Sequence, residues 1–190
     1  MIQLHPVKNS DRLNSDFKEI YETSFPDDER REWTQLLEIL DNKQFILNEI
    51  YDQQKYLGFI SIWNLTEFNF IEHFAIRTTE QGKGYGTQTM EHVLSTNSKP
   101  IVLEIEEPLT ETARKRMEFY ERLNFTVNDF SYFQPPYSIG KSSVKLLLMS
   151  YPAKIKPEDF ERIKDQIYHW VYGHNNEALE SETIEDFLTD

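Results

Sequence analysis

The chain begins with two different spacings of hydrophobic residues. The segment MIQLHPV at residues 1–7 has the composition of a short strand. A helix capped by Ser10 is expected next, because apolar side chains recur three and four positions apart; the stripe consists of Leu13, Phe17, Ile20 and Tyr21. After the break at Phe25 and Pro26, Asp27 and Asp28 lead into a second helical stripe, which consists of Trp33, Leu36, Leu37 and Leu40. The pattern predicts a strand followed by two helices.

The middle of the chain is rich in β-branched and aromatic residues. Three such segments, joined by short polar links, predict successive antiparallel strands at residues 45–51, 56–65 and 68–76. The glycine-rich turn QGKGYG then leads into a predicted helix over residues 85–96 and a strand over residues 101–106. This order places the glycines between a strand and the start of a helix.

The last part of the chain predicts a helix over residues 111–123, then strands over residues 128–133 and 143–150 that form a hairpin around QPPYSIGKS. Beyond Pro152 an amphipathic helix carries Phe160, Ile163, Ile167, Trp170 and Val171, and the acidic end has a short apolar patch at Ile184, Phe187 and Leu188. We expect a domain over residues 1–152 and a helical extension over residues 153–190. The extension packs on that domain or, alternatively, forms a homodimer interface through Trp170.

Three glycines at alternate positions, Gly82, Gly84 and Gly86, carry the clearest chemical signal. Without Cβ atoms, a pyrophosphate can approach the main chain, and the N–H groups at the helix start can converge on it. An ordinary tight loop is the alternative reading. Two other phosphate motifs fail, because Thr87 stands where GxGxxG needs glycine, and Pro135 stands where a P-loop needs glycine before Gly140-Lys141-Ser142.

At this loop the sequence resembles the GNAT superfamily of N-acetyltransferases. Gln81, Gly84 and Gly86 match its acetyl-CoA signature of Gln or Arg, two residues, Gly, one residue, then Gly or Ala. The segments IEHFAIRTTEQGKGYGTQTM and EFYERLNF look like the family's central strand, pyrophosphate loop and later helix, and together they span residues 71–125. Asn124 replaces a glycine of the family pattern, and Ala113 stands where many members carry an asparagine that contacts the cofactor. Asparagine tolerates the left-handed backbone, so the first departure is mild.

The resemblance implies an α/β fold of the α+β type, with a mixed, mostly antiparallel sheet of about seven strands flanked by helices and an extra C-terminal helix. It also implies acetyl-CoA as cosubstrate. The backbone of Phe74, Ala75 and Ile76 would pair with the pantetheine arm like an added strand. The pyrophosphate would be held by the loop residues Gln81, Gly82, Lys83, Gly84, Tyr85, Gly86 and Thr87. Lys83 and Arg77 would add local positive charge.

Catalysis needs an acid and a base. Tyr120 occupies the position of the family's tyrosine, which protonates the departing CoA thiolate, although a core aromatic packed beside Met117 and Leu123 is the plain alternative. For the base, Glu72 is the first choice and Glu104 the second, because carboxylates within apolar strands can have raised pKa values. Glu106, His73 and a water relayed by several polar groups remain alternatives.

Composition narrows the classes of function. At 190 residues and 38% hydrophobic content the chain can form one domain with a substantial core. The absence of cysteine excludes an acyl-cysteine intermediate, so direct attack of an amine on the thioester is expected. The net charge of −13 argues against a nucleic-acid partner and favours a cationic acceptor. We find neither a membrane-spanning segment nor a signal peptide and expect a cytoplasmic protein without a metal.

The acceptor, a small-molecule or peptide amine, is not specified by the sequence. In this fold its pocket is assembled from variable segments, here residues 24–31 and 134–141, whose aromatic and acidic content suggests a cationic or amphipathic amine. Because fold and cofactor loop do not guarantee turnover, a non-catalytic acyl-CoA-binding sensor or interaction module on the same fold is the alternative function.

Overall fold

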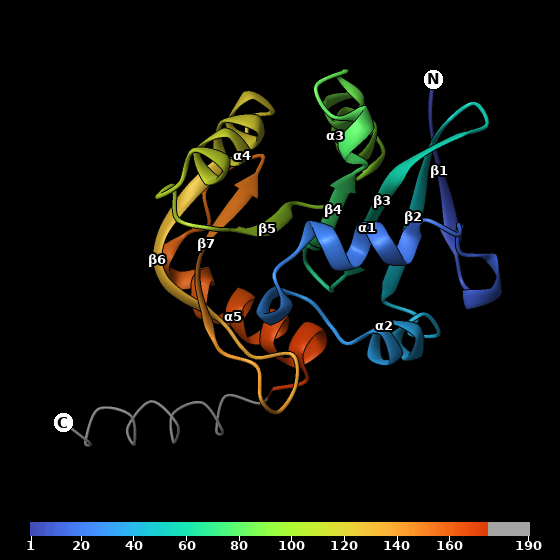
Figure 1. Ribbon diagram of the computed structural model, residues 1–190. Helices are drawn as coiled ribbons and strands as arrows, with labels where there is room; N and C mark the ends of the chain where they lie inside the picture. Colours follow the sequence, from blue (N-terminus) through green and yellow to red (C-terminus); the bar gives the residue numbers. More distant parts are fainter. Residues whose placement is uncertain (175–190) are drawn as a thin grey trace.

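A computed structural model describes residues 1–174 and shows a seven-stranded sheet in the order β1-β2-β3-β4-β5-β7-β6 (Figure 1). Only β4 and β5 are parallel neighbours, and the other adjacent strands are antiparallel. The strands are β1 (Ile2–Val7), β2 (Phe45–Asp52), β3 (Lys55–Asn64), β4 (Asn69–Ile76), β5 (Ile101–Ile105), β6 (Thr126–Gln134) and β7 (Val144–Tyr151). This is the mixed, mostly antiparallel sheet that the sequence predicts.

Five α-helices flank the sheet within the described residues: α1 (Phe17–Ser24), α2 (Trp33–Ile39), α3 (Tyr85–Thr96), α4 (Glu111–Arg122) and α5 (Pro157–Ile167). Short 3₁₀ turns occur at Ser10–Arg12, Asp27–Glu29 and Thr78–Glu80, and a π-helical turn, η4, covers Tyr168–Tyr172. The order of elements agrees with the prediction throughout. Asn124, after α4, has a φ of 64°, which confirms that asparagine takes the left-handed conformation there.

The first two helices begin later than the hydrophobic pattern predicts. Ser10 starts a 3₁₀ turn capped by Asn9, and the chain is extended at Leu13. The N–H of Asn14 donates to Oε1 of Glu49 on β2, so the sheet holds this segment and α1 starts only at Phe17. In the same way α2 starts at Trp33 rather than at the acidic residues, because Glu32 forms a capping box with Gln35.

Each face of the sheet buries its own hydrophobic cluster. Helices α1, α2 and α5 cover one face, where Phe17, Tyr21 and Trp63 are almost fully buried. Helices α3 and α4 cover the other face, where Met90, Val93 and Tyr120 pack against the strands. A sheet with both faces covered excludes water from its middle strands, so polar side chains placed there lie in a medium of low dielectric.

The sheet opens at its parallel pair. Strands β4 and β5 are paired only between Asn69–Ile71 and Ile101–Leu103, after which β5 continues alongside β7. The register of β4 against β3 shifts at Glu72, since Ile62 pairs with Ile71 and Ser61 pairs with His73. Beyond this bulge Phe74–Ile76 pair with β3 but, among the described strands, have no partner on the β5 side. One edge of β4 is thus left open to a ligand.

Gly58 lets β3 lie close against this part of β4. A Cβ atom at Gly58 would lie 2.0 Å from the carbonyl oxygen of Ala75, so no other residue fits without moving the backbone of β4. Gly58 therefore allows β3 to pair closely with one edge of β4 at Ala75 and Ile76, where the other edge of β4 is open.

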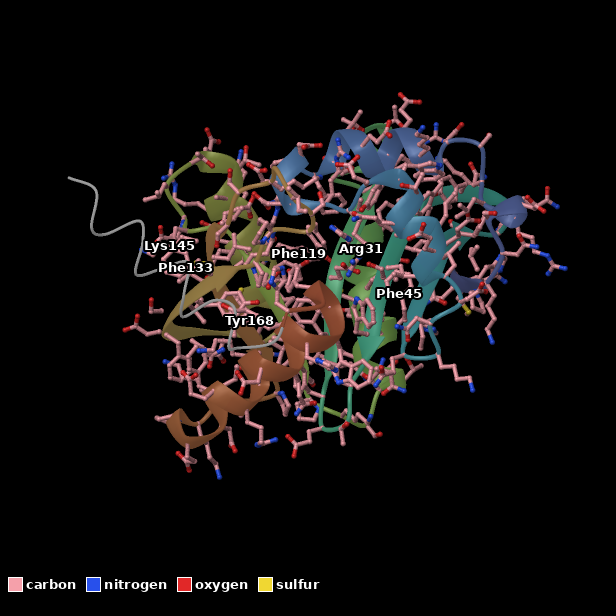
Figure 2. The ribbon with its side chains drawn as sticks, turned by 90° about the horizontal axis from the view of Figure 1, so that it is seen from below. Arg31, Phe45, Phe119, Phe133, Lys145 and Tyr168 are labelled. Carbon is pink, nitrogen blue, oxygen red and sulfur yellow. The ribbon has the colours of Figure 1, made fainter. Side chains whose placement is uncertain are left out.

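The C-terminal segment packs on the same core. Phe160, Ile167 and Val171 belong to the cluster that also contains Phe17 and Trp63. Figure 2 shows Tyr168 beside α5 and Arg31 near the middle strands of the sheet. Phe133 and Lys145 lie on the side of β6 and β7. Trp170 remains 39% exposed, and the Ile184, Phe187 and Leu188 patch lies outside the described residues. In residues 1–174 no helix has the length and apolar content needed to cross a bilayer.

Candidate active site

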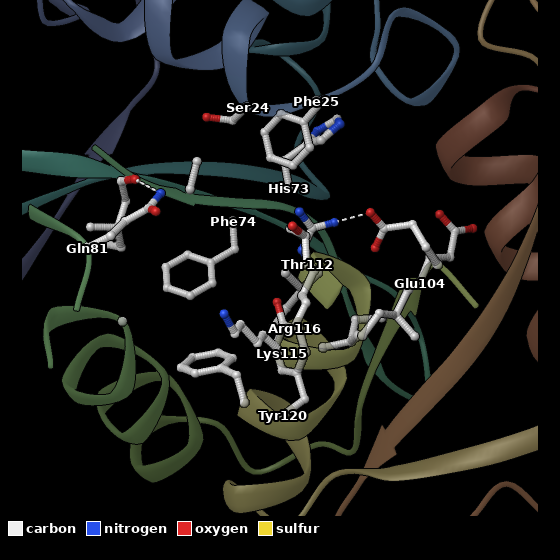
Figure 3. Close-up of a pocket in the computed structure, with 18 of the residues that line it drawn as sticks. Ser24, Phe25, His73, Phe74, Gln81, Glu104, Thr112, Lys115, Arg116 and Tyr120 are labelled. Carbon is white, nitrogen blue, oxygen red and sulfur yellow. Dashed lines mark hydrogen bonds and ion pairs between the residues drawn. The ribbon is translucent and has the colours of Figure 1, made fainter. Parts of the chain in front are cut away.

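A cavity of about 980 Å³ lies where β4 and β5 separate (Figure 3). Its walls come from the open edge of β4, the loop at residues 81–87, α4 and β5. Most of the predicted cofactor-binding residues line it: Phe74, Ala75, Ile76, Gln81, Gly82, Gly84, Gly86 and Thr87. Lys83 and Tyr85 do not line it, since Lys83 is turned toward Glu80 and Tyr85 packs against the core.

The glycine-rich loop has the backbone that an anion site requires. Gly82 and Gly84 have φ values of 76° and 82°, in the left-handed region that favours glycine. Gly84 is the N-cap of α3, and both Gly84 and Gly86 line the cavity. The first N–H groups of α3, which have no partner within the helix, and the positive end of the helix dipole therefore lie at the cavity wall. These features fit a diphosphate and need no side chain.

The two predicted cationic contributors are already paired. Lys83 Nζ lies 3.1 Å from Oε2 of Glu80, which also accepts from Lys55 at 2.6 Å. Arg77 lies 2.9 Å from Asp16. The side chain of Gln81 donates to the carbonyl of Ile76 at 2.9 Å and so ties the loop to the end of β4. The main-chain N–H groups of the loop, rather than its cationic side chains, are therefore the groups best placed to bind a phosphate.

Tyr120 faces the cavity from α4. Its side chain is 7% exposed and packs against Phe119 and Phe125, yet within residues 1–174 its hydroxyl has no hydrogen-bond partner. Burial, together with the nearby Glu106, raises the pKa of Tyr120 to about 12, while Arg116 opposes the increase. The hydroxyl is thus held protonated and unpaired at the wall of the cavity, as an acid requires.

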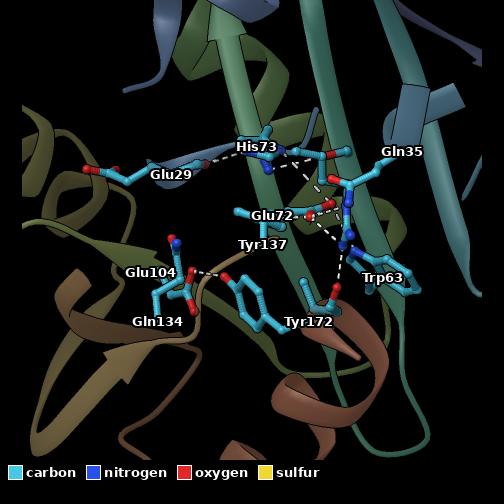
Figure 4. Close-up of polar contacts among 12 residues, drawn as sticks. Glu29, Gln35, Trp63, Glu72, His73, Glu104, Gln134, Tyr137 and Tyr172 are labelled. Carbon is cyan, nitrogen blue, oxygen red and sulfur yellow. Dashed lines mark hydrogen bonds and ion pairs between the residues drawn. The ribbon is translucent and has the colours of Figure 1, made fainter. Parts of the chain in front are cut away.

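Glu72 lies in the bulge of β4, and both oxygens of its carboxylate accept hydrogen bonds (Figure 4). It accepts hydrogen bonds from Arg31 Nε at 3.1 Å, Trp63 Nε1 at 2.9 Å and Tyr137 Oη at 3.0 Å, and its side chain is 0% exposed. Burial alone would raise the pKa of Glu72, but Arg31, His73 and the hydrogen bonds together lower it. This carboxylate is the charged partner of Arg31 in a buried ion pair, which is a poor arrangement for accepting a proton.

Glu104 lies on β5, and the geometry around it is different. Oε1 accepts a hydrogen bond from Tyr132 on β6, and Oε2 accepts one from Tyr172 at 2.6 Å. In the part of the chain that the structure describes, no cation pairs with this carboxylate. Burial, with repulsion from Glu72 and Glu29, raises the pKa of Glu104 to about 7, although the two tyrosine hydroxyls lower it. Glu104 lines the cavity and changes charge near neutral pH, as a general base should.

The two remaining candidates for the base are less suited. His73 is 3% exposed, and its Nε2 lies 3.0 Å from the carbonyl of Glu29. Burial lowers the pKa of His73, so the ring is neutral and Nε2 donates to that carbonyl. Glu106 forms a close ion pair with Arg116. His73 therefore holds the turn at Asp27–Glu29 in place, and Glu106 is neutralised by its partner.

The predicted acceptor segments do meet at one end of the cavity. Ser24, Phe25 and Glu29 line it from the first segment, and Gln134 and Tyr137 line it from the second. The second segment is tied to the first through main-chain carbonyls. Gln134 Nε2 donates to Asp28 at 2.9 Å, and Lys141 Nζ donates to Asp27 at 2.7 Å and to Arg30 at 2.8 Å. These hydrogen bonds hold the two segments together at this end of the cavity.

Sequence reasoning missed the partners of the two carboxylates, namely Arg31, Tyr132, Tyr137 and Tyr172. Arg31 and Tyr137 lie within the segments predicted to form the acceptor pocket, so their segments were identified although their roles were not. Tyr132 and Tyr172 had no local signal, because each reaches Glu104 from far along the chain. No group of His, Cys, Asp and Glu within residues 1–174 is arranged to hold a metal ion.

Comparisons with known proteins agree with this geometry. The model of the acetyltransferase (GNAT) family matches residues 10–125. A solved structure assigned to the GNAT acetyltransferases, from Bacteroides thetaiotaomicron, has a TM-score of 0.85 and 34% identity, covering 91% of this chain and 99% of that one. No curated protein sequence matches the chain.

More distant structures share the fold. The ribosomal-protein-S18-alanine N-acetyltransferase from Escherichia coli has a TM-score of 0.58 at 14% identity and covers 84% of this chain and 98% of its own. A GNAT acetyltransferase from Elizabethkingia anophelis with acetyl-CoA bound has a TM-score of 0.55 at 15% identity and covers 78% of this chain and 96% of its own. The chain therefore belongs to the GNAT family of acetyl-CoA-dependent N-acetyltransferases.

Proposed function

We propose that this protein transfers the acetyl group of acetyl-CoA directly to a primary amine of a small molecule or peptide, with Glu104 as the general base and Tyr120 as the general acid. The observation that carries the proposal is that both groups line one cavity, the first as a carboxyl with a pKa of about 7 and the second as an unpaired, protonated hydroxyl. The neighbour with acetyl-CoA bound supports the same cosubstrate for this chain.

Binding of the cosubstrate would use the main chain. The left-handed glycines 82 and 84 and the start of α3 fit a diphosphate, and the open edge of Phe74–Ile76 fits an extended amide-containing arm. The carbonyl of Ile76 is already engaged by Gln81, so pairing at that residue would use its second lone pair or displace the side chain. Phe74 and Phe119, whose ring centroids lie 6.3 Å apart, offer apolar contact beside this edge.

The reaction then needs several proton movements. An amine that arrives as an ammonium ion gives one proton to Glu104, and its nitrogen lone pair attacks the thioester carbonyl. The C–S bond breaks as the C–N bond forms, and Tyr120 gives its proton to the leaving thiolate. The nitrogen of the new amide then loses its surplus proton to the Tyr120 phenolate, and Glu104 releases the first proton to solvent. Because the chain has no cysteine, no acyl-cysteine can intervene and the transfer is direct.

The charge of the acceptor end favours a cationic acceptor. Glu29 and Glu104 line it, and burial raises the pKa of both, with repulsion from Glu106 adding to the effect at Glu29 and repulsion from Glu72 and Glu29 adding to it at Glu104. Since a proton moves from the acceptor to a carboxylate of pKa about 7, an α-amine, with an ordinary pKa of about 8, costs roughly 1 kcal/mol to deprotonate. A lysine-like amine, at about 10.4, costs roughly 5 kcal/mol in the same step. We therefore favour amines of lower pKa as acceptors.

The proposal is tested by measuring thiol release from acetyl-CoA with a thiol reagent across a panel of amino acids, peptides with free N-termini and polyamines. The chain contains no cysteine, so every thiol detected comes from CoA and the protein gives no background. We expect release that depends on the amine and falls at least a hundredfold in Glu104→Gln. Tight CoA binding without release for any amine would instead support the non-catalytic acyl-CoA sensor.

A further inference from the structure

Tyr172 reaches the site from a part of the chain beyond the segment that matches the family model, which ends at residue 125. It is the last residue of the π-helical turn η4. Its hydroxyl donates to Oε2 of Glu104 at 2.6 Å, across 68 residues of sequence (Figure 4). The C-terminal segment therefore contributes a polar group directly to the carboxylate that we assign as the base.

The structure holds Tyr172 firmly in this position. Its side chain is 7% exposed, and its ring lies 4.9 Å from that of Tyr137. The preceding residue, Val171, accepts a hydrogen bond from the buried Arg31, and Tyr168 Oη donates to the carbonyl of Phe133 at 2.5 Å. Because η4 is anchored at both Tyr168 and Val171, the Tyr172 hydroxyl has little freedom to leave the carboxylate.

Tyr132 and Tyr172 bind different oxygens of the Glu104 carboxylate. Tyr132 donates to Oε1 and Tyr172 donates to Oε2 of Glu104. A carboxylate oxygen has two acceptor positions, so each oxygen keeps one position for an incoming amine. With both oxygens held, the plane of the carboxylate is fixed while its ability to accept a proton is retained.

We propose that Tyr172 is a positioning residue, which fixes the orientation of the Glu104 carboxylate and keeps it charged for proton transfer from the acceptor amine. This inference rests on the proposed role of Glu104 as the base. It gives the C-terminal segment a part in acetyl transfer, in addition to its packing against the core.

The charge state of Glu104 depends on groups from several elements. Its titratable neighbours are Glu29 before α2, Glu72 on β4, Tyr132 on β6, Tyr137 after β6, and Tyr168 and Tyr172 in η4. Burial and the two glutamates raise the pKa of Glu104, and the hydroxyls of Tyr132 and Tyr172 are the groups that lower it. Removing the Tyr172 hydroxyl should therefore raise this pKa further and leave less carboxylate at neutral pH.

The test is a carbon-13 NMR titration of the full chain labelled at the glutamate side-chain carboxyls, with the Glu104 signal assigned by its loss in Glu104→Gln. In Tyr172→Phe we expect the titration midpoint of Glu104 to rise by about one to two pH units, the effect of losing one hydrogen bond to a charged group. Tyr51→Phe is the matched control, since it removes a hydroxyl that donates to a different glutamate, Glu49 on β2, and not to Glu104. We expect it to leave the midpoint unchanged.

An unchanged midpoint in Tyr172→Phe, or an equal shift in Tyr51→Phe, would overturn the proposal. A second measurement needs only the unaltered protein, labelled at the ring carbon that carries the tyrosine hydroxyl. The signal of Tyr172 should follow the titration of Glu104 and that of Tyr51 should not, and the reverse result would also overturn the proposal. Neither measurement requires turnover, so failure of the acetyl-transfer hypothesis would be recognised separately, in the thiol assay.

Discussion

Replacing Glu104 by glutamine should stabilise the protein at alkaline pH, although it removes a group that we propose takes part in catalysis. Burial raises the pKa of Glu104 from an ordinary 4.5 to about 7, so the folded state binds a proton that the unfolded state has already released. The sign follows directly. Glu104 favours folding when it is protonated, and this contribution is lost as the pH rises from the unfolded pKa through the folded one.

The magnitude follows from the two pKa values. At 1.36 kcal/mol for each pKa unit, the difference between 4.5 and about 7 corresponds to about 3 kcal/mol of unfolding free energy above pH 8. Glutamine keeps the shape and one carbonyl oxygen but has no charge to bury. We therefore expect Glu104→Gln to match the unaltered protein near pH 4, below the ordinary pKa of 4.5, and to exceed its unfolding free energy by up to about 3 kcal/mol near pH 9.

The assay is urea unfolding followed by circular dichroism at a series of pH values. Glu72→Gln is the matched control, because Glu72 is a buried glutamate on the neighbouring strand whose pKa is lowered by Arg31 against the effect of burial. It should lose about 3–5 kcal/mol at every pH in this range, since the uncompensated Arg31 remains buried. A difference between Glu104→Gln and the unaltered protein that does not change with pH would refute the reasoning.

Substitutions at three further positions test the cavity and the turn after α4. Tyr120→Phe should lower kcat by about two orders of magnitude and leave the Kd of CoA unchanged, because the hydroxyl acts only on the leaving thiolate; a changed Kd in calorimetry would contradict this role. Gly84→Ala should lower the free energy of unfolding by about 1–2 kcal/mol, because φ at this position is 82°. It should also weaken the binding of CoA and leave the binding of an apolar probe to the cavity unchanged. Asn124→Ala should cost about 1 kcal/mol in urea unfolding, since its φ is 64°, and Asn124→Gly should cost nothing; equal losses in both would rule out backbone strain as the cause.

The sequence by itself determined the order of the elements and the position of the glycine-rich loop. Both are local properties, since hydrophobic spacing distinguishes helix from strand, and glycine at positions 82 and 84 permits the left-handed backbone that the loop adopts there. The starts of α1 and α2 were predicted too early because contacts with β2 and the Glu32 capping box, which the hydrophobic spacing does not register, decide where these helices begin.

Only the tertiary structure decided between Glu72 and Glu104. Each is a glutamate within an apolar strand, so a local pattern describes both equally well. Arg31, 41 residues before Glu72, keeps that carboxylate charged, whereas Glu104 has two tyrosine hydroxyls and no cation among its described neighbours. The proton affinity of a buried carboxylate depends on what folding places beside it, and those partners are far away in the sequence.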